Sequence, residues 1–424
     1  MLGVNWSGVD VFVYTMADFC NDVIDEFLED MGNLTDNFDD LSTGSDNELR
    51  AENRRAKKSR LIPFYRTRKD ILSYFSADKL MTTFRFDRPS IEYITGFIIQ
   101  KLLQNESPLI HELSIFQHLL PIFLPRRKTK ARRNLLPLDM VLIALQFYAT
   151  GTFQTVVGNV LRYSQASVSR SIAAVSLSLS LISANHIRFP DNLNNLKREY
   201  AEIARLPGVI GSIDGTHIRI QRPILYEKAY VNRKNYHSIN VQAICDAGYK
   251  FLSVCGTKPG SCHDSSIFKG SAIGKKFESG FFGTSILLGD SGYSNTPFLF
   301  IPYNDPVEGY KIRFNRAHKS TRCTIERSFG ILKKRFHVLH SEIRMSPTKV
   351  SWVIVACCVL HNLAIDLKMP LDDNWAVDGD DFHQEENMPE LEIRPTGTIT
   401  QKEAALRRLG NTKRDRVASK TFPR

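Results

Sequence analysis

The chain has 424 residues, of which 42% are hydrophobic and 24% charged, and this composition is that of a globular protein. It excludes a fibrous protein and one that is disordered throughout. No Lys or Arg precedes Arg50 and the longest unbroken apolar run, Trp352 to Leu360, has nine residues, so we expect neither a secretory leader nor a membrane span.

The net charge of +11 conceals an uneven distribution along the chain. Residues 1–49 hold twelve acidic residues and no base, so the rest of the chain carries +23. Nine more acidic residues, again without a base, lie between Asp372 and Glu392, and the remainder therefore carries +32. Such an excess favours a polyanionic partner, with nucleic acid first.

Seven cysteines are spread along the chain at irregular spacing, which favours reduced thiols in a cytosolic or nuclear protein. They are Cys20, Cys245, Cys255, Cys262, Cys323, Cys357 and Cys358. A zinc site built from three of these cysteines and His263 would need paired spacings that the sequence lacks, so buried cysteines on strands are the better interpretation.

The first 60 residues form an acidic segment with a basic end, which we predict to be a tail. Eight bases lie between Arg54 and Lys69, where they could address the protein to the nucleus, contact phosphate, or simply form a solvated charge run. We predict that residues 61–200 are helical, with a second basic cluster, Arg126 to Arg133, linking two helices.

Residues 137–184 carry the clearest helical pattern. Apolar residues from Leu138 to Tyr148 mark one face of a helix that ends at Gly151, a second short helix covers 153–161, and Ser164 can cap a third. A short turn followed by a helix with small polar residues and an arginine at its start is the layout of a helix-turn-helix reader. On that interpretation Ser167, Ser169 and Arg170 contact DNA. Three packed helices without a DNA contact remain the alternative.

The pattern between residues 207 and 370 changes to short β-rich runs followed by helices, which predicts an α/β fold. Strands are expected at 209–220, continuing past an Asp-Gly interruption, and at 238–245, 251–255 and 286–288. The spacing of Ile325, Phe329, Leu332 and Phe336 predicts an amphipathic helix, and residues 351–367 a buried one. We predict that residues 371–424 are an acidic, then basic, tail.

Three carboxylates occupy chemically suggestive places in this region. Asp214 and Asp290 each follow an apolar strand segment beside glycine, and we expect both at a sheet edge, while Glu326 borders the buried stripe of the amphipathic helix. Carboxylates about 5 Å apart would repel by roughly 3 kcal/mol per pair at an effective dielectric near 20, unless a cation neutralised them. Oxygen ligands favour Mg²⁺ or Mn²⁺, and two such ions can hydrolyse a phosphodiester.

The helix that carries Glu326 is otherwise basic. Residues 311–336 contain nine bases and Glu326 as the single acid. That acid is either an ion-pair partner or a metal ligand within a phosphate-binding surface, and the two strand-end Asp residues favour the metal.

Several short blocks follow one another in a recognisable order across residues 130–370. They are Gly151–Gln154, Ser164–Arg170, Ile213–His217, Tyr230–Lys234, Pro259–Asp264, Leu287–Tyr293, Ile325–Phe336 and Cys357–Asn362. Together these blocks resemble those of the transposases of PIF/Harbinger elements and of the nucleases derived from them in animals.

The resemblance implies a ribonuclease H-like mixed sheet with flanking helices over residues 207–370. Its Asp-Asp-Glu triad falls on Asp214, Asp290 and Glu326 as catalytic and metal-binding residues, with Asp264, His263 and His217 in support. The resemblance also implies a divalent metal cation and DNA as substrate. It further implies a Myb-like DNA-binding partner protein and a nuclear setting, to which we add the cytoplasm, and it leaves a homo-oligomer open.

Four bases on the helix of Glu326 are further candidates for DNA contact, namely Arg322, Arg327, Lys333 and Lys334. A catalytically silent DNA-binding or adaptor protein on the same fold is the alternative to the nuclease. A serine protease is discarded, although Gly289 to Gly292 resembles a nucleophile segment, because the remaining features of that class are missing.

Overall fold

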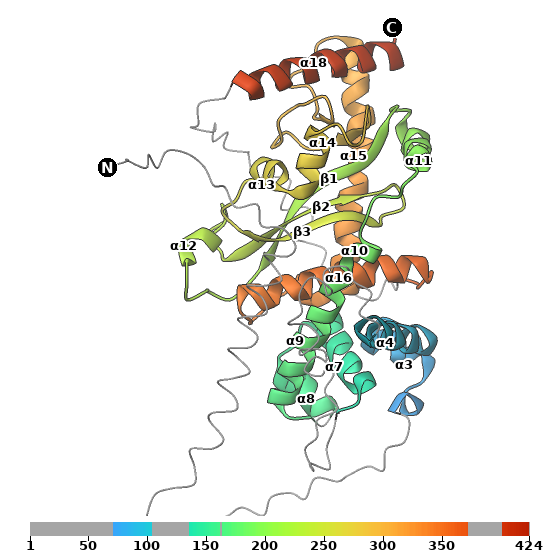
Figure 1. The fold of residues 1–424 in the computed structure, drawn as a ribbon, viewed down its shortest axis with the longest axis vertical. Coiled ribbons are helices and arrows are strands. Elements are labelled where there is room, and N and C mark those ends of the chain that lie inside the picture. Colours follow the sequence, from blue (N-terminus) through green and yellow to red (C-terminus); the bar gives the residue numbers. More distant parts are fainter. Residues whose placement is uncertain (1–70, 104–134, 162, 372–400, 424) are drawn as a thin grey trace, which may run out of the picture. The chain divides into compact units, whose positions relative to one another are not determined.

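A computed structural model of the chain describes residues 71–103, 135–161, 163–371 and 401–423 (Figure 1). The chain divides into two compact units, residues 1–74 and 75–424. The first is described only over the short helix η1 (Ile71–Tyr74), and the second is the subject of all that follows. The two acidic segments, the basic clusters at 54–69 and 126–133 and Cys20 lie outside the described residues.

The second unit is built on one mixed sheet of five strands, in the order β3-β2-β1-β4-β5. The strands are β1 (Val209–Arg219), β2 (Ser238–Cys245), β3 (Phe251–Pro259), β4 (Ile286–Leu288) and β5 (Leu299–Phe300). β1 pairs antiparallel with β2 and parallel with β4, β2 pairs antiparallel with β3, and β4 parallel with β5. The predicted α/β class is confirmed, and β1 lies at the centre of the sheet.

A β-bulge between Val209 and Gly211 sets which residues of β1 face which side of the sheet. Beyond it, Ser212 and Asp214 face one side, and Ile213 and Gly215 face the other, because side chains alternate along a strand. All eight residues of β2 are buried, as expected of a strand covered on both faces.

Helices cover both faces of this sheet (Figure 1). On the face of Asp214, α15 (Gly309–Arg335) packs Phe314 and Ala317 against Ile286, Leu288 and Phe300, joined by Tyr200 of α11 (Asn194–Ala204). On the other face, α13 (Asp264–Gly270) and α14 (Ala272–Glu278) pack Phe268 and Phe277 against Ile213 and Leu287. The small helix α12 (Glu227–Tyr230) lies in the connection between β1 and β2.

The helices that precede the sheet are α3 (Ala77–Phe84), α4 (Arg88–Leu103), α7 (Pro137–Thr150), α8 (Gln154–Leu161), α9 (Gln165–Leu181) and α10 (Ser183–His186). Gly151 ends α7 in the left-handed conformation, at φ 62°, and the Ser164 side chain caps α9 by accepting from the Ser167 amide. The predicted helices are therefore present, whereas a DNA-reading role for them stays a prediction.

The last core helix, α16 (Pro347–Asp366), is long and apolar enough to cross a membrane, but 78% of its most apolar window is buried inside the protein. It packs on α9, where the Ser180 hydroxyl donates to the Trp352 carbonyl across 3.1 Å. Tyr148 of α7 and Ser176 of α9 share a buried hydrogen bond of 2.6 Å. α16 is thus a buried helix that lies between α9 and the strand β3 of the sheet.

The expected tail after residue 371 differs from the structure at its end, because residues Gln401–Thr421 form a helix, α18. Its residues Gly410, Arg414 and Ala418 are buried, and Ala418 belongs to the core that α15 forms with β4 and β5. Two bases of this helix, Lys413 and Arg414, donate to backbone carbonyls of the fold and so hold it in place.

Candidate active site

Asp214 lies within β1, opposite Ala243 of β2. This differs from the prediction, which placed Asp214 at a sheet edge. It follows the last residue pair between β1 and β4 by two positions, since that pairing ends at Ser212 and Leu288. Its neighbour on the same face, Ser212, is buried and accepts a hydrogen bond of 3.0 Å from Thr324 of α15. This bond fixes α15 directly beside Asp214.

Asp290 comes two residues after the end of β4. Because Ser212 pairs with Leu288 in a parallel register, the chain leaves β4 on the side where β1 continues to Asp214, and the charge of Asp290 acts on Asp214. The Gly292 amide donates to Oδ1 of Asp290 across 3.1 Å and thereby holds the carboxylate in its loop. The sequence prediction that Asp290 follows a buried strand is confirmed.

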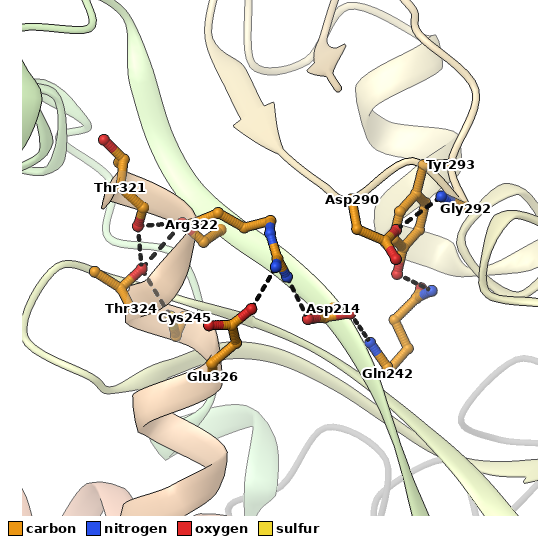
Figure 2. A network of polar contacts seen from close by, with 12 residues as sticks. Asp214, Gln242, Cys245, Asp290, Gly292, Tyr293, Thr321, Arg322, Thr324 and Glu326 are labelled. Carbon is orange, nitrogen blue, oxygen red and sulfur yellow. Dashed lines mark hydrogen bonds and ion pairs between the residues drawn. The ribbon is translucent and has the colours of Figure 1, made fainter. Parts of the chain in front are cut away.

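Glu326 lies on α15, one helical turn after Arg322, and this arginine joins two of the carboxylates. Its Nη1 donates to Oδ2 of Asp214 across 2.7 Å, and its Nη2 donates to Oε1 of Glu326 (Figure 2). The Arg322 side chain is only 19% exposed. The guanidinium therefore serves as the cation between two acids that would otherwise face each other.

The charge balance around Asp214 is unusual for an aspartate. Burial raises the pKa of Asp214 to about 7, Arg322 opposes this rise, and the nearby charge of Asp290 adds to it. A buried aspartate whose pKa is shifted this far by burial and by a charged neighbour is a candidate functional residue.

Asp264 lies on the other face of β1, below the first carboxylate. A Cβ atom on Gly215 would lie 2.4 Å from Oδ1 of Asp264, so the missing side chain of Gly215 provides the space for this carboxylate. Oδ1 accepts from Nδ2 of Asn240 across 2.7 Å, and Nε2 of Gln242 contacts the Asp264 carbonyl at 2.8 Å. Burial raises the pKa of Asp264.

Tyr293 links this lower network to the upper carboxylates. Its hydroxyl lies 2.9 Å from Nε2 of Gln242, and burial together with the charges of Asp264, Asp214 and Asp290 raises its pKa well above the ordinary value. Sequence reasoning missed Asn240, Gln242 and Tyr293. A usable signal existed, since Asn240 and Gln242 are amide residues two apart in a strand that is otherwise apolar after Ser238.

The two predicted supporting histidines occupy different places. Nδ1 of His263 lies 2.6 Å from the Arg233 guanidinium, directly before α13. Nδ1 of His217 lies 3.0 Å from the Ser238 hydroxyl, which also accepts from Asn232. His217 faces the side of Gly215 and Asp264 rather than the side of Asp214.

The predicted DNA contacts fall into two groups. Ser167, Ser169 and Arg170 lie in the first turns of α9, where Arg170 is exposed. On α15, Arg327 is exposed, Lys333 donates to the Thr216 hydroxyl across 2.9 Å, and Lys334 is half-buried, while Arg322 is engaged as described above. These positions leave the predicted role in DNA binding a prediction.

Carboxylate oxygens are the candidate metal ligands at this site. Among the residues that the structure describes, no three His, Cys, Asp or Glu side chains lie close enough together to hold one ion. The donor chemistry nevertheless suits a hard divalent cation, because the ligands on offer are carboxylate oxygens, and the Arg322 guanidinium already stands in as a cation between Asp214 and Glu326. The described cysteines are free thiols and form no competing cluster.

The fold and the site together give a mixed α/β sheet with carboxylates on its central strand β1, after the parallel strand β4 and on the helix α15. Comparison with known families agrees, since residues 213–362 match the family model described as "DDE superfamily endonuclease".

The similarity to individual proteins extends beyond that domain. "Putative nuclease HARBI1" of Homo sapiens is 34% identical over 316 residues, which cover 72% of this chain and 86% of the human protein. The Mus musculus protein of the same name is 33% identical over 76% of this chain and 93% of its own length. "Protein ALP1-like" of Arabidopsis thaliana is 28% identical over 55% of this chain and 62% of its own length. No solved structure matches.

The chain therefore belongs to the family of Harbinger transposase-derived nucleases, and the resemblance seen in the sequence is confirmed.

Proposed function

We propose that this protein is a DNA endonuclease that hydrolyses phosphodiester bonds by a two-metal mechanism at Asp214, Asp290 and Glu326. The order β3-β2-β1-β4-β5, with three antiparallel strands followed by two parallel ones, supports the ribonuclease H-like interpretation of the sheet. The family match supports a nuclease. What we propose beyond the family is the Asp-Asp-Glu triad, its divalent metal ions and the two-metal mechanism.

The strongest support for this proposal is the Arg322 guanidinium, which lies between two of the three acids. Arg322 bridges Asp214 and Glu326, and Asp290 is close enough to raise the pKa of Asp214. Three carboxylates, from β1, from the loop after β4 and from α15, are therefore linked to one another, two through Arg322 and the third through its charge. Such a set stays ionised together only when positive charge lies among its members.

In the proposed reaction, Asp214, Asp290 and Glu326 would hold the divalent ions, which supply an activated water and stabilise the leaving 3′ oxygen. The other residues position this set. Thr324 and Ser212 fix α15 on β1, and the Gly292 amide orients Asp290. Arg322 must leave at least one of its two carboxylates to make those oxygens available, and its guanidinium then faces an incoming phosphate.

DNA contacts outside the triad, a partner protein and the cellular location are further parts of this proposal. The bases Arg322, Arg327, Lys333 and Lys334 of α15 and the start of α9, with Ser167, Ser169 and Arg170, would contact the DNA backbone. A Myb-like partner protein, a nuclear or cytoplasmic location and a homo-oligomer belong to the same proposal through the family resemblance.

One observation favours the second candidate, a catalytically silent DNA-binding or adaptor protein. The bridge of Arg322 to Asp214 and Glu326 is a complete structural ion-pair network, which would hold the carboxylates in place without catalysis. On this reading the three acids stabilise the contact between β1 and α15.

Nicking of supercoiled plasmid in Mn²⁺ separates the two candidates. We expect the wild type to nick and Asp290→Asn to be inactive, with folding checked by circular dichroism. Asp246→Asn is the matched control, because Asp246 is also a largely buried aspartate but lies in the turn between β2 and β3. Equal nicking by the wild type and Asp290→Asn, or none by the wild type, would remove the nuclease proposal.

A further inference from the structure

We infer that the outer face of α18 is a second binding surface for the DNA phosphate backbone, formed by Arg408, Arg416 and Lys420. This inference rests on the proposed function, since it assumes that DNA is the substrate. It concerns a helix that the nuclease proposal above does not use.

The basic residues of α18 divide into two groups by their contacts. Four of the seven are engaged with the protein. Lys402 pairs with Glu278, Arg407 donates to the Ser294 hydroxyl, Lys413 donates to the carbonyls of Thr284 and Pro297, and Arg414 donates to the carbonyls of Ile301 and Pro302.

The three remaining bases, Arg408, Arg416 and Lys420, are exposed. At 3.6 residues per turn, positions i, i+8 and i+12 fall within one third of the helix circumference. Gly410, Arg414 and Ala418 are buried on the opposite side. The three cations thus share the face that points away from the fold.

No acid of α18 neutralises that outer face. The helix holds two acidic residues, and both already contact the rest of the fold: Glu403 pairs with Lys269, and Asp415 accepts from the Tyr303 hydroxyl across 2.7 Å. The outer face therefore carries three positive charges from one helix, which favours a polyanion.

Spacing and location favour a nucleic acid strand as that polyanion. Arg408 and Lys420 are twelve residues apart, so the three cations extend over about 18 Å along the helix. A DNA strand carries one phosphate per about 3.4 Å of axis, so this length matches about five phosphates. Ser294, which accepts from Arg407, lies four residues after Asp290, so α18 covers the loop that carries this carboxylate.

The test measures binding of the full-length chain to a 30-base-pair duplex by fluorescence anisotropy in EDTA, over a series of NaCl concentrations. The variant Arg408→Gln/Arg416→Gln/Lys420→Gln should reduce the slope of log affinity against log salt by about 2.7, at roughly 0.9 per lost contact. At 0.1 M NaCl its affinity should fall by about tenfold or more. Arg408→Lys/Arg416→Lys should keep the wild-type slope, because it keeps the charge.

The matched control, Arg188→Gln/Arg198→Gln/Lys368→Gln, removes three exposed bases from other elements and should bind like the wild type. The inference is overturned if the α18 variant keeps the wild-type slope or if both triple variants weaken equally. It is also overturned if the α18 variant loses affinity for polyglutamate but not for the duplex, which would indicate an acidic protein partner. A wild type that binds no duplex would remove the DNA substrate of the proposed function as well, whereas binding without nicking would leave this surface intact.

Discussion

Arg322 of α15 and Asp214 of β1 form a direct ion pair, with 2.7 Å between Nη1 and Oδ2. This pair joins the central strand to the helix that crosses it. The other terminal nitrogen of the guanidinium, Nη2, donates to Glu326. The arrangement makes one arginine both a structural tie and the occupant of the space between two candidate metal ligands.

Replacement of this arginine should separate its two roles. Without metal, Arg322→Ala should lower the free energy of unfolding by about 2 to 3 kcal/mol, because the largely buried Asp214 and the half-buried Glu326 lose their partner. Mn²⁺ should then raise the melting temperature of the variant by more than that of the wild type, since the ion no longer competes with a guanidinium. Arg322→Lys should give an intermediate shift. Equal Mn²⁺ shifts in all three proteins would contradict the competition.

Gly215 should tolerate no side chain. Gly215→Ala places a methyl group 2.4 Å from Oδ1 of Asp264, and we expect a loss of about 1 to 3 kcal/mol in the free energy of unfolding, measured by urea denaturation. Gly270→Ala is the control, because a Cβ at that position meets nothing within 4 Å. A neutral Gly215→Ala would mean that Asp264 moves aside without cost.

Asp246, in the turn between β2 and β3, should make stability depend on pH. Burial raises the pKa of Asp246 to about 6. Between pH 4 and 6 the folded protein retains this proton while the unfolded chain loses it, so the free energy of unfolding falls as the pH rises through this window.

Asp246→Asn removes that loss and can keep the acceptor for the Lys250 amide, which lies 2.8 Å from Oδ1. Relative to the wild type we expect no gain near pH 4 and a gain of about 2 to 3 kcal/mol above pH 6, measured by urea denaturation across the series. A gain that is constant with pH would assign the effect to something other than this proton.

The absence of a side chain at Gly410 should be needed for α18 to pack closely on the loop that follows Asp290. A Cβ on Gly410 would lie 2.6 Å from the carbonyl carbon of Thr296, so Gly410→Val should lift the helix from the loop that follows Asp290. We expect faster amide exchange across residues 401–421 with little change in β1 or β2. Leu409→Val is the control for β-branching on this helix, since Leu409 is 60% exposed. Equal exchange in the two variants would contradict the close packing.

Much of the fold was predictable because burial on both sides of the sheet leaves a simple trace in the sequence. β2 and β4 occupy the predicted residues, since both are continuous buried runs bounded by turn residues. β5 was missed because it has two residues and too short a pattern. α18 was missed because bases line the side that packs on the fold. Their partners are backbone carbonyls, which leave no pattern in the sequence.

The candidate site was predictable only in part. The three carboxylates stood out by type and by their neighbours, but the position of Asp214 within β1 depends on pairing with β2, which continues to Arg219. The bridge made by Arg322 depends on how α15 docks on β1, and an arginine within a basic helix gives no sign of it. Asn240 and Gln242 needed the register between β2 and β1 to be placed beside Gly215.

The ribosome synthesises α18, the helix that contacts the loop after Asp290, late in translation. The contacts between α18 and residues 294–302 join positions more than one hundred residues apart. At translation rates of about 5 to 20 residues per second, the loop emerges roughly 5 to 25 seconds before its partner helix exists. A sheet that forms during synthesis therefore has one end uncovered for this interval, and a nascent chain arrested before residue 401 would carry all three acids yet lack α18.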